Sequence, residues 1–175
     1  METDEALAAR VAEGDELALR ELLRRYERPL LGFLYRQTGG RDVEDLYQET
    51  WLRVVRHAPR FDAARRFSTW LFQIAVNLCR DWHRRPPPEP HVGSDDEPAG
   101  AQLERSEAAL DAAHLLRQLS EAQREVVVLR YYHDLSEDAV AKILDIPLGT
   151  VKSRMHQALA RLTALVRSEE ARAAS

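Results

Sequence analysis

The stretch LSEDAVAKILDIPLGTVKSRMHQALARL, residues 135–162, holds two helical patterns separated by a break. Ser136 is suited to cap a first short helix, and DIPLG, residues 145–149, interrupts the apolar spacing. Thr150 is suited to cap a second helix, whose apolar residues recur every three or four positions. This predicted buried stripe consists of Val151, Met155, Leu159, Leu162 and Val166. The whole pattern predicts a helix-turn-helix.

At the start of the second helix, five polar or basic residues lie outside this stripe: Lys152, Ser153, Arg154, His156 and Gln157. In a helix-turn-helix, side chains at this position reach base edges, and cations hold phosphates. The alternative is an ordinary helical hairpin with a solvated face. The turn residues, the stripe and the basic first turn together favour DNA binding.

Helical spacing continues over most of the remaining chain. Asp15 is a plausible N-cap for a helix that ends at Gly39-Gly40, and Pro29 should kink or split it. Asp42 is expected to cap the next helix, whose predicted inner face is Val43, Leu46, Tyr47, Thr50, Trp51 and Val54. A third helix is expected to open at Ser68 or Thr69.

In the C-terminal part, Ser120 and Gln123 fit a capping box, and the helix that they open runs through VVVLRYY, residues 126–132. Valine-rich runs can be strands, but this one is short and has helical patterns on both sides. The fold class predicted is therefore all-α.

The clearest boundary is PPPEPHVGSDDEPAG, residues 86–100, with five prolines and little apolar surface. We expect two small helical domains, 1–85 and 108–168, joined by a flexible acidic Pro-rich linker, 86–107, and followed by a polar tail, 169–175. Residues 51–85 hold eight arginines and two aspartates, and 150–175 hold five cations and two glutamates. Two basic blocks in a chain of net charge −4 suggest a polyanion held at two places.

The first basic block contains RFDAARRFSTWLFQIAVNLCRDWHRR, residues 60–85, in which arginines alternate with aromatics. Guanidinium groups that follow phosphates and aromatic faces that stack on bases suit single-stranded nucleic acid. The alternative is that Trp70 and Phe72 are simply core, and the helical phase places Trp70 there. Phe67, expected in the loop before the helix cap, is the aromatic most free to meet a base.

An enzyme would have to use Cys79, the only cysteine, with Asp81 or a histidine such as His83. No companion ligands with regular spacing accompany this pair, so we expect no catalytic residue, no metal site and no cofactor. The other alternative, a dimeric duplex-DNA regulator, would leave the basic aromatic block unexplained. The single cysteine and the absence of a signal-like or membrane-spanning run favour a cytoplasmic protein without membrane insertion.

Four segments follow one another along the chain: DVEDLYQETWLRVVRH (42–57), RFSTWLFQIAVNLCRDWHRR (66–85), an acidic linker and LSEDAVAKILDIPLGTVKSR (135–154). In this order they resemble the extracytoplasmic-function (group IV) sigma factors of bacterial RNA polymerase. The resemblance covers about residues 8–168. It implies an alternative sigma factor, not an enzyme, that binds core RNA polymerase and directs promoter recognition, minus-10 melting and transcription initiation. The implied partners are core polymerase, promoter DNA and an anti-sigma factor, with no small-molecule substrate.

The resemblance also assigns residues. Those implied to bind core polymerase are Asp42, Glu44, Asp45, Gln48 and Glu49. Those implied to bind minus-10 DNA are Arg60, Arg65, Arg66, Phe67, Asn77, Arg80, Arg84 and Arg85, the first four in a loop that receives a flipped base. Those implied to bind minus-35 DNA are Thr150, Lys152, Ser153, Arg154, His156 and Gln157.

Two features of the resemblance concern other segments. The linker would follow the RNA exit path of the polymerase, where Glu89, Asp95, Asp96 and Glu97 imitate RNA charge; the alternative is a solvated tether. The family commonly has an Arg-Ala-Arg run where this chain has Gln157-Ala158-Leu159, so two cations expected near the minus-35 element are missing.

Overall fold

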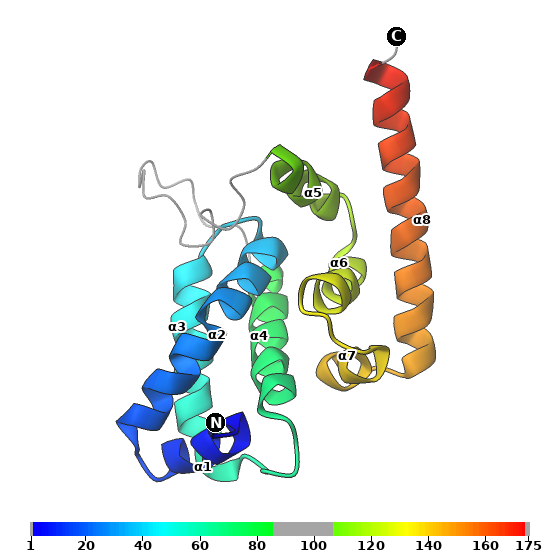
Figure 1. Ribbon diagram of the computed structural model, residues 1–175. Coiled ribbons are helices and arrows are strands. Elements are labelled where there is room, and N and C mark those ends of the chain that lie inside the picture. The colour runs from blue at the N-terminus through cyan, green and yellow to red at the C-terminus, as the bar shows by residue number, and fades with distance from the viewer. Residues whose placement is uncertain (1, 86–106, 174–175) are drawn as a thin grey trace. The chain divides into compact units, whose positions relative to one another are not determined.

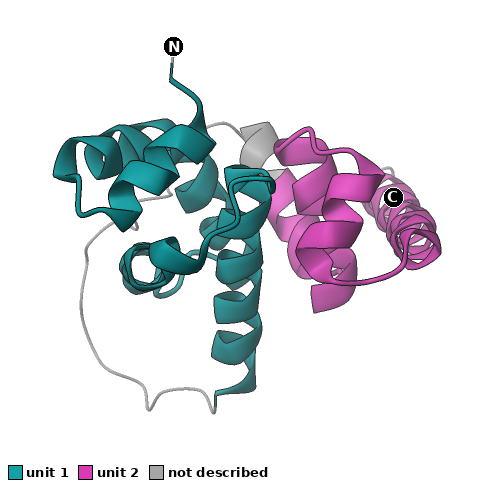
Figure 2. Cartoon of the chain, turned by 90° about the horizontal axis from the view of Figure 1, so that it is seen from below, with its two compact units in different colours: residues 1–101 teal, residues 102–175 magenta. Residues whose placement is uncertain are grey.

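The chain folds, in a computed structural model that describes residues 2–85 and 107–173, into two compact units (Figures 1 and 2). Unit 1 is residues 1–101 and unit 2 is residues 102–175. Every element in the described ranges is helical, so the prediction of an all-α fold with two helical domains is confirmed. Residues 86–106, which hold most of the predicted linker and the acidic residues Glu89, Asp95, Asp96 and Glu97, lie outside the described residues.

Unit 1 is a bundle in which α2, α3 and α4 pack side by side and α1 lies across one end (Figure 1). The short helix η1 and the loop that follows it lie at that same end. The elements are α1 (Asp4–Ala12), α2 (Glu16–Thr38), α3 (Val43–His57), η1 (Ala58–Arg60) and α4 (Phe67–Arg84).

Local signals set the ends of α2. The Asp15 carboxylate accepts hydrogen bonds from the backbone N–H groups of Leu17 (2.9 Å) and Ala18 (3.2 Å), as an N-cap should. Gly39 ends the helix in the left-handed conformation, with φ 66°. Pro29 does not split the helix, which runs without a break from Glu16 to Thr38. The proline removes one backbone donor, and packing of α2 on three neighbouring helices outweighs that loss.

The core of unit 1 is formed by leucines and aromatic rings from all four α-helices. Leu22, Leu30 and Leu34 of α2 are fully buried, and Phe33 meets Phe72 of α4 edge to face at 5.5 Å. Five of the six residues predicted for the inner face of α3 are buried, and the sixth, Tyr47, is half-buried. Burial of this face holds α3 in the bundle and leaves the opposite face in solvent.

Unit 2 contains α5 (Glu107–Arg117), α6 (Glu121–Val127), the π-helical turn η3 (Val128–Tyr132), α7 (Glu137–Leu144) and α8 (Leu148–Ala173). The predicted capping box at the start of α6 is present, with both Ser120 and Gln123 bonded to each other's backbone N–H. The segment VVVLRYY is helical, as expected. Its valines are buried, and α6 packs against α8.

The last helix is longer than the sequence pattern indicates. α8 continues to Ala173, into the segment 169–175 that was expected to be a polar tail. Residues 166–172 are all exposed, so these final turns add no core to unit 2.

Candidate nucleic-acid and polymerase interfaces

The loop between η1 and α4 is ordered by its own backbone. The Asp62 carboxylate accepts from the N–H of Ala64 at 2.9 Å, and the N–H of Arg65 donates to the Asp62 carbonyl at 2.9 Å. This is an Asx-type turn, which fixes a tight loop without burying it. Arg60, Arg65 and Arg66 are all exposed around it, so the loop presents three cations to solvent.

Phe67 is not in this loop and is not free. It is the first residue of α4, one or two positions before the predicted start, and its side chain is 0% exposed. Its ring packs against Tyr26 (5.4 Å between centroids), Trp70 (5.9 Å) and Phe61 (6.0 Å), and stacks near Trp51 (6.5 Å). The expectation that Phe67 lies free in the loop is therefore wrong, because an aromatic cluster already surrounds the ring.

A different aromatic pair lies beside the loop. The rings of Phe61 and Trp70 are 4.8 Å apart, and both side chains are half-buried. Sequence reasoning placed Trp70 in the core and overlooked Phe61. The sequence did indicate that Phe61 lies at the loop, because it directly follows Arg60 in the basic segment. This pair is a partly exposed aromatic surface at the two ends of the loop that carries Arg65 and Arg66.

The solvent-facing side of α4 continues from Trp70 in helical steps through Gln73, Asn77, Arg80 and Arg84. Arg65 of the loop donates to the Gln73 amide oxygen at 3.1 Å, which connects the loop to this face. Arg84 is held on the helix surface by Asp81 at 2.7 Å and remains largely exposed. Arg85 ends the helix and is exposed. The predicted minus-10 residues other than Phe67 thus share one continuous surface, which we call the α4–loop face.

A pocket of about 560 Å³ opens beneath the loop. Its walls come from the start of α1, from Tyr26 of α2 and from both sides of the loop: Thr3, Asp4, Glu5, Tyr26, Ala63, Ala64, Arg65, Arg66 and Ser68. Burial and a hydrogen bond from its hydroxyl to Asp4 raise the pKa of Tyr26, so this phenol stays protonated. Acids and arginines face each other across the pocket.

The acidic surface on α3 differs in detail from the prediction. Asp42 precedes α3 in the left-handed conformation (φ 54°) and makes no side-chain cap. Its carboxylate instead accepts from the indole N–H of Trp82 at 2.7 Å, while Arg41 lies 4.8 Å from the centre of the Trp82 ring. Asp42 thus occupies the N-cap position of α3, as expected, but its side chain bonds to α4 and does not cap the helix.

The remaining predicted polymerase residues, Glu44, Asp45, Gln48 and Glu49, lie on the outer side of α3. Two exposed apolar residues that sequence reasoning missed follow them along α3: Leu52 is 58% exposed and Val55 is 42% exposed. The sequence did offer a sign of this, because both residues lie outside the predicted buried stripe. Helical steps of three and four place Asp45, Gln48, Leu52 and Val55 in one row, so this face is acidic and polar in the first half of α3 and apolar in the second half.

The helix-turn-helix of unit 2 is present. Ser136 caps α7 by accepting from the N–H of Ala139 at 3.2 Å, and Asp145 ends it in the left-handed conformation (φ 53°). α8 begins at Leu148, so Thr150 lies inside the first turn and does not cap the helix. The N–H groups of Thr150 and Val151 donate to the Pro147 carbonyl at 2.9 and 3.2 Å.

Lys152, Ser153, His156 and Gln157 are exposed on one side of α8, whereas Arg154 and Thr150 are half-buried at its edge. The ammonium of Lys152 lies 4.0 Å from the Glu137 carboxylate of α7. The buried stripe of α8 differs from the prediction at one position: Leu159 is 40% exposed, and the neighbouring Ala158 is fully buried instead.

Cys79 and His83, the pair that an enzyme would have to use, are not arranged as a catalytic site. Cys79 is 1% exposed in the core of α4, and the ring of His83 hydrogen-bonds the Gln37 carbonyl at 3.1 Å. Within residues 2–85 and 107–173, no three His, Cys, Asp or Glu side chains are grouped so that they could hold a metal ion.

Comparison with known proteins decides the family. Residues 22–86 match Sigma-70 region 2, and residues 109–162 match Sigma-70, region 4. An extracytoplasmic-function (ECF) RNA polymerase sigma-E factor of Haemophilus influenzae is 33% identical over 177 residues, which span 89% of this chain and 91% of the relative. The chain belongs to the ECF sigma factors.

A second relative and a solved structure also resemble this chain over most of its length. The ECF sigma factor SigW of Bacillus subtilis is 32% identical over 166 residues, which span 84% of this sigma factor and 88% of SigW. The solved structure of CnrH, in complex with the cytosolic domain of CnrY, superposes with a TM-score of 0.74 at 29% identity, over 95% of this chain and 99% of that one.

The two matched regions fall in different units, region 2 in unit 1 and region 4 in unit 2. The family expected from the sequence is thus confirmed, and this alternative sigma factor directs transcription initiation. In the part of the chain that the structure describes, no helix is both long and apolar enough to cross a membrane.

Proposed function

We propose that the two units of this sigma factor divide promoter recognition between them. The α4–loop face of unit 1 binds and opens the minus-10 element, and the exposed start of α8 in unit 2 binds the minus-35 element. The observation that supports this division best is the presence of an exposed basic surface in each unit, within the region 2 match and the region 4 match respectively.

At the minus-10 element, the loop residues Arg60, Arg65 and Arg66 would hold phosphates, and Asn77 with Arg80, Arg84 and Arg85 would extend that track along α4. An unstacked base would rest against the half-buried pair of Phe61 and Trp70. Stacking on an aromatic side chain is worth about 1–3 kcal/mol per base, which offsets the few kcal/mol that unpairing costs. Binding and distortion then suffice, so we propose no enzymatic chemistry for this chain.

At the minus-35 element, Lys152, Ser153, His156 and Gln157 would enter the major groove from the first turns of α8. Arg154 and Thr150, at the edge of the helix, are better placed for the phosphate backbone. Glu137 lies beside Lys152 and would orient its ammonium before DNA binds.

Core RNA polymerase would bind the outer face of α3. Acidic side chains provide charge complementarity to a basic partner, and Leu52 with Val55 adds exposed apolar surface beside them, which protein interfaces bury. Binding to polymerase and promoter DNA also implies a cytoplasmic location. Because CnrH was solved with the cytosolic domain of CnrY, we propose that an anti-sigma factor holds this chain in a similar way.

The test is run-off transcription with bacterial core polymerase on the DNA upstream of the gene that encodes this chain. We expect a discrete transcript only when the chain is present, and stoichiometric retention of the chain on core polymerase. Asn77→Ala should retain core binding and lose promoter opening. A chain that binds this DNA without core polymerase and represses transcription would contradict the proposal.

A further inference from the structure

Helix α4 begins without a cap of its own. Its N-cap residue is Arg66, whose side chain accepts no hydrogen bond from the helix. The first N–H of the helix, that of Phe67, instead donates to the Glu5 carboxylate of α1 at 3.0 Å, across 62 positions of sequence. A carboxylate at a helix N-terminus satisfies a free donor and is favoured by the helix dipole. Glu5 therefore caps α4 from a different helix.

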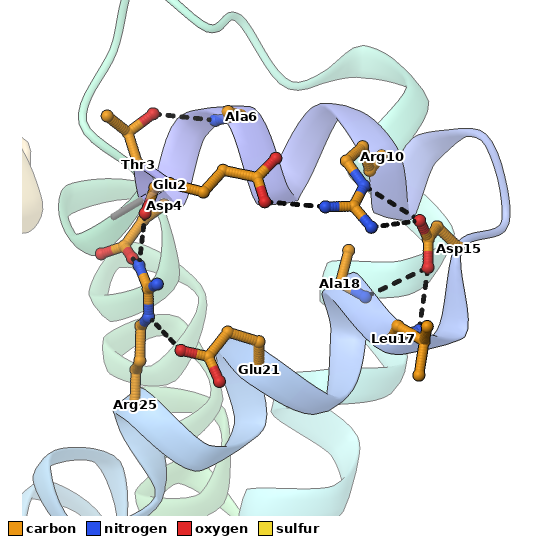
Figure 3. A network of polar contacts seen from close by, with 10 residues as sticks. All are labelled: Glu2, Thr3, Asp4, Ala6, Arg10, Asp15, Leu17, Ala18, Glu21 and Arg25. Carbon is orange, nitrogen blue, oxygen red and sulfur yellow. Dashed lines mark hydrogen bonds and ion pairs between the residues drawn. The ribbon is translucent and has the colours of Figure 1, made fainter.

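The start of α1, which carries Glu5, is bonded to α2 through the neighbouring Asp4 (Figure 3). The neighbouring Asp4 accepts from Arg25 at 2.6 Å and from the hydroxyl of Tyr26, and Arg25 is also bonded to Glu21 at 2.8 Å. At the other end of α1, Arg10 pairs with Asp15 at 2.7 Å. Both ends of α1 are thus tied to α2, which holds the Glu5 carboxylate in place.

Glu5 also lies next to the proposed base-binding loop. Asp4 and Glu5 line the same pocket as Ala63, Ala64, Arg65 and Arg66. The bond from Phe67 to Glu5 comes directly after Arg66, where the loop joins α4. Loss of this bond would free the end of the loop, while the aromatic cluster would still hold the ring of Phe67. Helix α1 precedes the segment 22–86 that matches region 2, so that match assigns it no role.

We propose that Glu5 is a positioning residue for promoter opening. It fixes the junction of the loop and α4, so that Arg65, Arg66 and the pair of Phe61 and Trp70 keep the arrangement that holds an unstacked base. Glu5 does not itself contact DNA. This inference rests on the proposed function of the loop, and it adds α1 to the machinery of promoter opening.

The test uses holoenzyme and single-stranded DNA that carries the minus-10 element of a promoter transcribed in the run-off assay. Abasic sites are introduced one position at a time, and affinity is measured for the wild type, Glu5→Ala, Glu5→Gln and Glu13→Ala. Glu13 is an exposed acid at the end of the same helix and is the matched control. Binding to core polymerase is measured for each variant.

For the wild type, we expect one abasic position to weaken binding by roughly tenfold or more, as loss of one stacked base should. For Glu5→Ala, this penalty should fall to about twofold, since the loop no longer holds the base well. Glu5→Gln keeps an oxygen acceptor and should lie between the two, and Glu13→Ala should match the wild type. All four proteins should bind core polymerase equally.

An unchanged abasic penalty in Glu5→Ala would overturn the inference, because an equal loss of affinity for DNA with and without the base would mean that Glu5 only stabilises unit 1. A loss of core binding in Glu5→Ala would overturn it for the same reason. A wild type with no sensitive position would overturn the proposed role of the loop itself, and the inference with it.

Discussion

The two units build their exposed surfaces in different ways. In unit 1, hydrogen bonds between distant residues hold the surface: Phe67 to Glu5, Trp82 to Asp42 and His83 to Gln37 span 62, 40 and 46 positions. In unit 2, the helices beneath the surface begin with local caps, Ser120 to Gln123 and Ser136 to Ala139, which span three positions each. A longer bond in unit 2, from Arg161 to the Gln118 carbonyl, joins α8 to the end of α5.

This difference bears on how each surface responds to change. A minus-10 surface held by the whole bundle should be sensitive to substitutions far from DNA. A minus-35 surface carried by α8, over helices α6 and α7 that begin with local caps, should respond mainly to substitutions on α8 itself. The five predictions below test this contrast, in order of decreasing effect.

The largest effect is expected in the core of unit 1. Phe67→Ala removes a fully buried ring and should lower the free energy of unfolding by about 3–5 kcal/mol. All three tryptophans, Trp51, Trp70 and Trp82, lie in unit 1, so tryptophan fluorescence in urea follows this unit. Leu17→Ala, at a side chain 70% exposed, is the control and should change stability little. Normal stability of Phe67→Ala with impaired promoter opening would restore the original expectation for Phe67.

The next effect concerns the exposed apolar residues in the second half of α3. Leu52→Asp should weaken binding to core polymerase by about 2 kcal/mol, since it places a charge where an apolar contact is expected. Binding can be measured by competition with a labelled wild-type chain. Leu17→Asp makes the same change at an exposed leucine of α2 and should leave the affinity unchanged. Equal affinities for both variants would remove Leu52 from the interface.

On α8, Lys152→Ala should weaken promoter binding by holoenzyme by about 1 kcal/mol. It should also reduce the slope of log affinity against log salt concentration by about one, as the loss of one phosphate contact would. Affinity is measured as a function of salt concentration. Arg167→Ala removes an exposed cation of the same helix, outside its first turns, and should have no effect. If the two variants behave alike, the DNA surface does not lie at the start of α8.

Removal of a local cap tests the stability of unit 2. Ser136→Ala should destabilise this unit by about 1 kcal/mol, whereas Ser136→Thr should largely restore it, because threonine also caps helices. Thermal unfolding followed by circular dichroism measures both. Full stability of Ser136→Ala would show that α7 depends on packing and not on its cap.

The smallest effect is a dependence on pH. Hydrogen bonds from Arg24 and Arg25 lower the pKa of Glu21 from 4.5 to about 2. Because the folded pKa is depressed, the contribution of Glu21 to stability is complete above pH 4.5 and is lost as pH falls toward 2. Glu21→Gln should therefore melt slightly below the wild type at neutral pH, and the gap should close in this window. A gap that persists at pH 2 would contradict this assignment.

The same contrast explains what could be predicted from the sequence. Ser120, Ser136 and Asp145 act on residues within a few positions, so a reader of the chain can place the capping box and the turn of the helix-turn-helix. The inner face of α3 followed from helical spacing alone. Leu159 was misplaced because a step of three from Met155 leads to Ala158 and a step of four leads to Leu159, and helical spacing alone does not choose between them; α8 buries Ala158.

The site of unit 1 was predicted less well, for a physical reason. Phe67, Asp42 and Trp82 have partners on other helices, and no local rule shows that Glu5 supplies the cap of α4 or that Trp82 competes for Asp42. The cations of the loop were placed on the surface because charges are rarely buried unpaired. The aromatic residue available to a base could not be chosen until the bundle showed which rings face inward.

The most direct test of the division between the units is permanganate reactivity of promoter thymines, measured per bound holoenzyme. With Asn77→Ala, we expect bound complexes whose minus-10 thymines stay unreactive. With Lys152→Ala, we expect fewer complexes, each with wild-type reactivity. Normal reactivity in Asn77→Ala together with loss of reactivity per complex in Lys152→Ala would contradict the account.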